Sequence, residues 1–115
     1  MNPYLEYSKP NFWLSCILID RGVNVTPEQI RLKLEDANIE ARPIWKPMHM
    51  QPIYRTNPFV TVEGNGRGRT NAYIKGSGVD VGADIFRRGL CLPSDNKMTE
   101  EQQDRIIEII HRCFL

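Results

Sequence analysis

The sequence predicts an α+β fold: a small antiparallel or mixed sheet with helices packed on one face. Three observations support this prediction. The run from Phe12 to Asp20 is rich in aromatic and β-branched residues, which favour strands. Capping boxes mark the beginnings of two helices, one at Thr26 and one at Thr99. The predicted elements follow in the order strand, helix, extended segment, short helix, strand, helix.

Length and composition describe one ordinary globular domain. The chain has 115 residues, of which 41% are hydrophobic and 25% charged, and its formal net charge is +1. A chain of this length supports one hydrophobic core, so we expect residues 1–115 to form a single domain. This length excludes a self-contained large enzyme fold. The near-neutral charge argues against disorder and against a general polyanion-binding surface.

The N-terminal part predicts a strand followed by a helix. Residues Phe12–Asp20 are apolar at both alternating positions, so we expect a central strand covered on both sides. The helix begins after Thr26, with Pro27 at the first helical position and Gln29 three residues after the cap, and it reaches about Asn38. Apolar residues recur on its packed face at Ile30, Leu34 and Ala37.

Prolines interrupt regular structure between Ala41 and Tyr54. Pro43, Pro47 and Pro52 each remove a backbone donor, so we expect neither a helix nor a central strand but an extended, rigid and irregular segment. Such a preset backbone is suited to holding polar side chains in a fixed arrangement at the edge of a site. The side chains concerned are Arg42, Trp45, Lys46 and His49.

A glycine-rich stretch, residues 56–82, is expected to be a loop insertion within the domain. Its glycines are Gly64, Gly66, Gly68, Gly76, Gly78 and Gly82. Its densest cluster, residues 64–69, lacks the Gly-Lys-Ser/Thr ending of a phosphate loop and is followed by Thr70 and further glycines, where a phosphate loop would open a helix. We therefore expect a surface loop, in which Arg67, Arg69 and Lys75 are the residues that would meet an anionic ligand if the loop closed.

The C-terminal part predicts a short helix over Ala83–Arg88 that is ended by Gly89, then a brief strand over Leu90–Pro93. The last helix begins with the capping box at Thr99. His111 lies near the end of that helix, where a cation is favourable, and we give it no chemical role. Apolar residues form a packed face on the last helix at Ile106, Ile107, Ile109, Ile110, Cys113 and Phe114.

The cysteines and histidines give little indication of a catalytic or metal-binding role. Cys16, Cys91 and Cys113 show neither a Cys-x-x-Cys pair nor metal-ligand spacing, so we expect buried thiols and no metal. His49 has two interpretations, a hydrogen-bonded structural imidazole or a substrate contact. The sequence shows no signal peptide and no apolar run near the roughly 20 residues of a membrane span. We expect a soluble, cytoplasmic protein with no membrane partner.

Two long segments resemble the DegT/DnrJ/StrS-type sugar aminotransferases, which are fold-type I enzymes dependent on pyridoxal phosphate. Residues 41–54 contain the form Arg-Pro-x-x-x-Pro-x-His, from Arg42 to His49. Residues 85–102 match a helix, a glycine, Leu-x-Leu-Pro-Ser and a Thr-capped final helix. Both segments stand in the family's order behind a strand and a Thr-Pro-Glu-capped helix. The resemblance covers nearly the whole chain and is to the family's C-terminal small domain.

The resemblance implies a function for a larger parent protein. Such an enzyme, usually a homodimer, transfers an amino group from glutamate to a keto group of a nucleotide-linked sugar, for cell-surface polysaccharide or amino-sugar biosynthesis. It implies that the pocket for the nucleotide sugar or the amino donor is lined by Arg42, Trp45, His49 and Tyr54.

The resemblance also places the Schiff-base lysine and the cofactor-binding residues in a large domain that precedes this part. None of the chain's lysines has the family's setting, in which Gly-Glu-Gly-Gly comes after the lysine. We therefore assign no catalytic or cofactor-binding residue here, and we expect this chain by itself to be inactive and to bind no pyridoxal phosphate.

Two other functions fit the sequence. The first is a stand-alone nucleotide- or RNA-binding module that uses the Arg/Gly loop, for which affinity would fall steeply as salt rises. The second is a structural domain whose role is dimerisation. The aminotransferase interpretation is favoured over both, and it includes no nucleic-acid partner.

Overall fold

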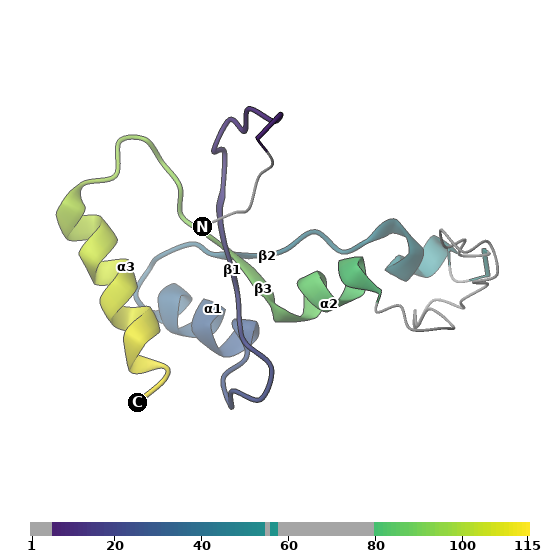
Figure 1. Cartoon of the computed structure of the whole chain (residues 1–115). Helices are drawn as coiled ribbons and strands as arrows, with labels where there is room; N and C mark the ends of the chain where they lie inside the picture. The colour runs from purple at the N-terminus through teal and green to yellow at the C-terminus, as the bar shows by residue number, and fades with distance from the viewer. Residues whose placement is uncertain (1–5, 55, 58–79) are drawn as a thin grey trace. The chain divides into compact units, whose positions relative to one another are not determined.

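The computed structural model describes residues 6–54, 56–57 and 80–115 (Figure 1). The chain divides into two compact units. The first comprises Met1–Ile44 with Arg88–Leu115, and the second comprises Trp45–Arg87. The single-domain organisation of residues 1–115 stays a prediction, as does the loop insertion, most of which lies outside the described residues.

The first unit is built on a three-stranded antiparallel sheet with strand order β1-β3-β2. In this sheet Cys91 of the middle strand lies opposite Cys16 on one side and opposite Arg42 on the other. The strands are β1 (Ser15–Leu18), β2 (Arg42–Pro43) and β3 (Gly89–Leu92). Together with the helices, this sheet confirms the predicted α+β fold class.

The prediction of a central strand over Phe12–Asp20 is wrong for the described part of the chain. β1 is only four residues long and lies at the edge of the sheet, where Phe12 and Trp13 just before it are 62% and 66% exposed. The central strand is β3, in which Leu90 and Cys91 are both buried. An apolar run predicts that a strand is buried, but it does not show which strands lie beside it in the sheet.

Helix α1 (Pro27–Asp36) packs against β3, β2 and helix α3 (Glu100–Arg112). Ile30 and Leu34 of α1 are fully buried, as the helical spacing predicts. The buried residues form one core cluster: Ile19, Ile30, Leu34, Ala41, Leu90 and Ile106. Because Leu90 presents one face of the sheet to this cluster, α1 and α3 cover that same face, and the predicted one-sided packing of these two helices is confirmed.

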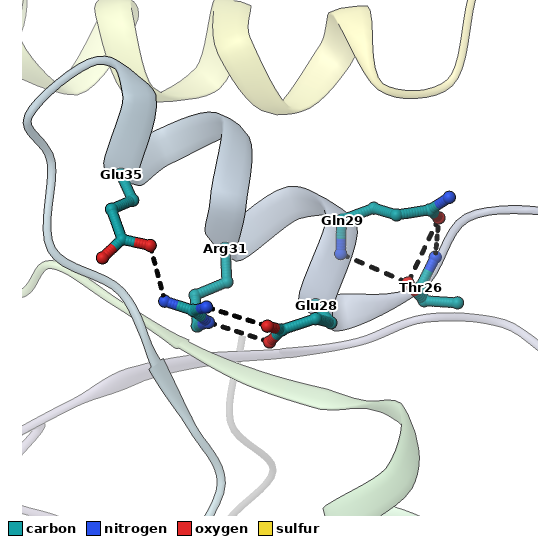
Figure 2. A network of polar contacts seen from close by, with 5 residues as sticks. All are labelled: Thr26, Glu28, Gln29, Arg31 and Glu35. Carbon is teal, nitrogen blue, oxygen red and sulfur yellow. Dashed lines mark hydrogen bonds and ion pairs between the residues drawn. The ribbon is translucent and has the colours of Figure 1, made fainter.

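The start of α1 follows the sequence prediction closely (Figure 2). The backbone N–H of Gln29 donates to Oγ1 of Thr26 at 3.2 Å, and the N–H of Thr26 donates to Oε1 of Gln29 at 2.8 Å. One turn later, the Arg31 guanidinium binds Glu28 at 2.8 Å and Glu35 at 2.9 Å. These contacts satisfy orphan donors of the first turn and link successive turns of the exposed face.

Helix α3 has the second predicted capping box, between Thr99 and Gln102. Its packed face is narrower than predicted, because Ile107 and Phe114 are 53% and 45% exposed in the described structure. An apolar stripe in a sequence does not show how far the opposing surface extends. The residues of this helix and its C-terminal turn that pack in or against the core are Ile106, Ile109, Ile110 and Cys113.

Helix α2 spans Val81–Arg88, so it begins two residues before the predicted start at Ala83 and ends where predicted. Gly89 does more than end this helix: it is the first residue of β3 and pairs with Leu18. The Pro-rich segment is irregular, as predicted, but it contains two one-turn 3₁₀ helices where only extended chain was expected. These turns are Met48–Met50 and Pro52–Tyr54.

Candidate functional site

Short-range hydrogen bonds fix the backbone of the Pro-rich segment in the second unit. Pro47 is extended, with φ −55° and ψ 147°, and its carbonyl accepts from the N–H of Met50 at 2.9 Å. The side-chain amide of Gln51 donates to the carbonyl of Lys46 at 3.2 Å, while the carbonyl of Gln51 accepts from Tyr54 at 3.0 Å. The turns therefore tie together the residues on both sides of His49.

His49 is bound by a carboxylate from a distant part of the sequence. Its Nε2 atom lies 2.6 Å from Oδ2 of Asp80, which is 31 residues further along the chain. The side chain of Asp80 is only 5% exposed and that of His49 is 18% exposed. A hydrogen bond between groups this far from water is electrostatically strong, because the local dielectric is low. The imidazole is therefore held in a defined orientation.

Asp80 is itself fixed by the beginning of α2. Its Oδ1 atom accepts from the N–H of Ala83 at 2.9 Å, and its backbone carbonyl accepts from the N–H of Asp84 at 2.9 Å. This is the pattern of an N-cap residue. Gly82 also lies in this turn, where an added Cβ would lie 3.2 Å from Cγ of Pro47. The absence of a side chain at Gly82 lets the first turn of α2 approach the Pro-rich segment.

A carboxylate-bound imidazole has definite chemical uses. The carboxylate fixes the ring orientation and the position of its proton, and the ring can then accept, donate or transfer a proton at its other nitrogen. The neighbouring aromatic residues differ in exposure: Trp45 is 62% exposed, whereas Tyr54 is half-buried. His49 is hydrogen-bonded, as the structural interpretation predicts, and its role as a substrate contact stays a prediction.

Arg42 belongs to the first unit, while Trp45, His49 and Tyr54 belong to the second. The Nε and Nη2 atoms of Arg42 lie 2.7 Å and 2.6 Å from Oε1 of Glu40. Both side chains are more than 70% exposed, and an exposed ion pair contributes little to stability. A carboxylate or phosphate of a ligand could therefore replace Glu40 at small cost and bind the guanidinium with two hydrogen bonds.

The register of the sheet places Arg42 on the same face as two cysteines. Direct partners in an antiparallel sheet share a face, and Cys91 has both Cys16 and Arg42 as partners. This face is opposite the one to which Leu90 and the core belong. The sulfur atoms of Cys16 and Cys91 lie 3.7 Å apart. Burial, with a smaller contribution from Cys16, raises the pKa of the Cys91 thiol to about 11.

Sequence reasoning missed Asp80. Its signal was the general one of a helix cap, an Asp just before an amphipathic turn. Nothing in the local sequence connects it with His49, because 31 residues, most of them in the glycine-rich stretch, separate the two. The proposed loop contacts Arg67, Arg69 and Lys75 lie outside the described residues, so the alternative nucleotide- or RNA-binding function stays a prediction.

The described lysines lie at the surface. A lysine that forms a Schiff base is activated by desolvation or by another cationic group. All four lysines in the described ranges are exposed: Lys9, Lys33, Lys46 and Lys97. The same ranges contain no cluster of three or more His, Cys, Asp or Glu residues suited to a metal ion. Their helices also include none that is long and apolar enough to cross a membrane.

Comparison with known proteins shows the class of this chain. The family model described as the DegT/DnrJ/EryC1/StrS aminotransferase family matches residues 4–111. The chain therefore belongs to this family, and the resemblance noted in the sequence is confirmed. The three-stranded antiparallel sheet and its helices are consistent with an aminotransferase small domain.

Two relatives show the extent of the similarity. EpsN of Bacillus subtilis (strain 168), whose name provisionally describes a pyridoxal phosphate-dependent aminotransferase, is 38% identical over 104 residues, covering 90% of this chain and 23% of EpsN. GDP-perosamine synthase of Caulobacter vibrioides (strain ATCC 19089 / CIP 103742 / CB 15) is 26% identical over 104 residues, covering 90% and 24%. The chain thus spans about a quarter of the length of these relatives.

Proposed function

We propose that this chain is the C-terminal small domain of a pyridoxal phosphate-dependent aminotransferase that acts on a nucleotide-linked keto sugar. Glutamate is the proposed amino donor, and the product serves amino-sugar or cell-surface polysaccharide biosynthesis. The observation that carries the proposal is the family match over residues 4–111. The name of GDP-perosamine synthase supports a nucleotide-linked sugar as the substrate class.

The proposed pocket residues are Arg42, Trp45, His49 and Tyr54. The exposed guanidinium of Arg42 suits a carboxylate or phosphate, since its fork binds two oxygen atoms at once. The exposed ring of Trp45 offers an apolar surface to a sugar or a base. His49 offers an imidazole whose orientation is fixed by Asp80. These properties support a substrate-binding role and assign no bond-making step to the chain.

The described residues contribute binding and orientation rather than the reaction itself. Pyridoxal phosphate, when bound by a complete enzyme, supplies the electron sink for amino transfer. Because the described lysines are exposed, we propose that the covalent attachment of the cofactor lies in the remaining length that the relatives have and this chain does not. By itself the chain is expected to be inactive, and the complete protein is expected to be a homodimer.

An amino-transfer assay tests the proposal. The complete natural polypeptide that contains this chain, loaded with pyridoxal phosphate, is incubated with ¹⁵N-labelled glutamate and nucleotide-linked keto sugars. We expect labelled amine on the sugar and stoichiometric 2-oxoglutarate, with much slower transfer to the corresponding free sugar. No transfer to any nucleotide-linked keto sugar, together with rapid transfer to a 2-oxo acid, would assign a different substrate class.

A second experiment tests whether the chain by itself carries a site for the cofactor. The 115-residue chain is mixed with pyridoxal phosphate and treated with borohydride, which fixes any lysine adduct for mass spectrometry. We expect no stoichiometric adduct at a single lysine, because the described lysines are exposed, whereas a Schiff-base lysine is activated by desolvation or by a neighbouring cation. One specific, stoichiometric adduct would show that the chain carries its own cofactor site.

A further inference from the structure

Two thiols face each other across the pairing of β1 with β3. Cys16 and Cys91 are direct partners in the antiparallel register, and their sulfur atoms lie 3.7 Å apart. Both are free cysteines in this structure. The sulfur atoms of a disulfide are about 2.05 Å apart, so these two would have to approach by less than about 2 Å to form one. Bond formation thus requires a change in side-chain torsions and no new strand pairing.

The hydrogen bonds of the ladder show which kind of pair the two cysteines form. The N–H of Ile19 donates to the carbonyl of Arg88 at 2.8 Å, which extends the register of β1 and β3 by one hydrogen-bonded pair. Hydrogen-bonded and non-hydrogen-bonded pairs alternate along an antiparallel ladder. Cys16 and Cys91 stand three pairs further along, so theirs is a non-hydrogen-bonded pair. Such pairs have Cα atoms about 4.5 Å apart, within the range of about 4.4–6.8 Å that a disulfide accepts.

The two thiols differ in their access to solvent. Cys91 is only 4% exposed, and burial is the main cause that raises its pKa to about 11. Cys16 is half-buried, so a small oxidant in solution reaches its sulfur atom more easily. Because the thiolate is the form that attacks an oxidant, a thiol held neutral by burial is a poor first nucleophile. Exposure and chemistry therefore both assign the first step to Cys16 and the second to Cys91.

We propose that Cys16 and Cys91 are a redox modification site, at which a hydroperoxide oxidises Cys16 and Cys91 then closes a disulfide between β1 and β3. In the first step the Cys16 sulfur attacks a peroxide oxygen, the O–O bond breaks, and Cys16 becomes a sulfenic acid. With hydrogen peroxide, the hydroxide that leaves takes up the proton lost by Cys16 and forms water. In the second step the Cys91 sulfur attacks the sulfenic sulfur, the S–O bond breaks, and a second water leaves with the Cys91 proton. Two thiols are oxidised and one peroxide is reduced.

The modification goes beyond the proposed function and does not depend on it. The bond ties the edge strand β1 to the middle strand of the sheet, and thiol reductants reverse it by exchange. Cys113 lies on the other side of the sheet, because it packs against the core cluster that contains Leu90, whereas neighbouring residues of a strand point to opposite faces. Its thiol donates to the carbonyl of Ile109 at 3.4 Å. Cys113 is therefore an internal reference for the reaction.

The reduced 115-residue chain is treated at neutral pH with hydrogen peroxide in small excess, and its peptides are analysed by mass spectrometry. We expect the chain to lose the mass of two hydrogen atoms, its thiols to fall from three to one, and Cys16 to be linked to Cys91, all reversed by dithiothreitol. The same oxidation in urea, where the strands are not paired, should give a mixture of all three linkages. Unchanged thiols, a main linkage to Cys113 or between two chains, or irreversible oxidation of Cys16 would overturn the proposal.

Serine variants separate the roles of the two thiols. Cys113→Ser is the matched control and should form the same disulfide, whereas Cys91→Ser should stop at a Cys16 sulfenic acid that dimedone traps. In Cys16→Ser, Cys91 should stay largely unmodified over the same time. Equally fast oxidation of Cys91 in that variant would overturn the assigned order of attack. Amide spectra of β1 and β3 show that each variant is folded, and the linkage in the wild type is measured without any substitution.

Hydrogen exchange tests the structural consequence of the bond. The amide hydrogens of β1 should exchange more slowly in the oxidised chain than in the reduced one, because an edge strand tied to its neighbour opens less often. The amides of α3, which lies on the opposite face, should exchange at the same rate in both states. An equal rate for β1 in the oxidised and reduced chains would show that the disulfide does not hold this strand.

Discussion

The carboxylate of Asp80 lies 2.6 Å from Nε2 of His49, although 31 residues separate them in sequence. The contact joins the N-terminal end of α2 to a 3₁₀ turn that follows Pro47. Because Asp80 also caps α2, helix formation and the orientation of the imidazole are physically linked. A change at Asp80 should therefore alter both the local stability of the helix and the state of the histidine.

The stability part of this link can be measured by native-state hydrogen exchange. Asp80→Ala removes the acceptor for Ala83 and the partner of His49, so we expect the opening free energy of α2 amides to fall by about 2 kcal/mol. Asp80→Asn keeps the cap and should lose about half as much. Equal losses in the two variants would show that the cap contributes nothing separate to the stability of α2.

The capping boxes should each contribute measurably to the first unit. Thr26→Ala and Thr99→Ala each remove the acceptor for the N–H of Gln29 or Gln102, and we expect a loss of about 1 kcal/mol in the free energy of unfolding by urea. Thr→Ser at either position retains the hydroxyl and is the matched control. If the alanine variants were as stable as the serine variants, the caps would not be stabilising.

The ion pairs of Arg31 predict that the stability of the fold depends on pH. The hydrogen bond from Arg31 holds the pKa of Glu28 below its ordinary value of 4.5. Because the pKa is lower in the folded state, the stabilisation is present above about pH 4.5 and is lost as pH falls through the folded-state pKa. A carboxyl NMR titration should show the pKa of Glu28 rising in Arg31→Gln.

The control for this titration is Lys33→Gln, which removes a positive charge from the same helix. It should leave the titration of Glu28 unchanged, whereas high salt should weaken the effect of Arg31, because exposed ion pairs are screened. An equal shift in both variants would mean that general charge, rather than the Arg31 hydrogen bond, lowers the pKa.

The raised pKa of the Cys91 thiol predicts that the stability of the fold and the reactivity of this thiol change at alkaline pH. Burial is the main cause that raises its pKa to about 11, from an ordinary value of 9.0. Because the pKa is higher in the folded state, the fold keeps its full stability below about pH 9 and loses stability as pH rises through about 11. Alkylation by iodoacetamide, followed by mass spectrometry, should modify Cys91 slowly at pH 8 and faster as the pH approaches 11.

The variant Cys16→Ser separates the two causes of this shift. Burial is the larger cause, so the pKa of Cys91 should stay raised in the variant and fall only slightly. Rapid alkylation of Cys91 at pH 8 in the wild type would contradict its burial. A pKa that returned to about 9 in Cys16→Ser would assign the shift to the neighbouring thiol instead.

The sequence predicts the local features of this fold better than its long-range pairings. The caps at Thr26 and Thr99 depend on side chains three residues apart, so the sequence predicts them and the structure confirms them. The position of the Phe12–Asp20 run in the sheet depends on which strand pairs with it, and there the prediction of a central strand is wrong.

The same distinction holds for the site. His49 stands out in the sequence because prolines surround it and set its backbone. Asp80 does not, because its relation to His49 exists only after α2 and the Pro-rich segment pack, with Gly82 allowing the close approach to Pro47. A local pattern can thus identify a residue in a rigid setting, but the partner that fixes its orientation is a property of the tertiary structure.

The central claim, that residues of this chain bind the substrate of an aminotransferase, is tested most directly by kcat/KM for a nucleotide-linked keto sugar in the complete polypeptide. We expect His49→Ala and Arg42→Ala each to lower this value at least about tenfold, because each would remove a hydrogen bond that we propose to form with the substrate. The control variant Glu101→Gln, which removes a carboxylate from the first turn of α3, should not change it. Unchanged turnover and KM in both alanine variants would contradict the claim.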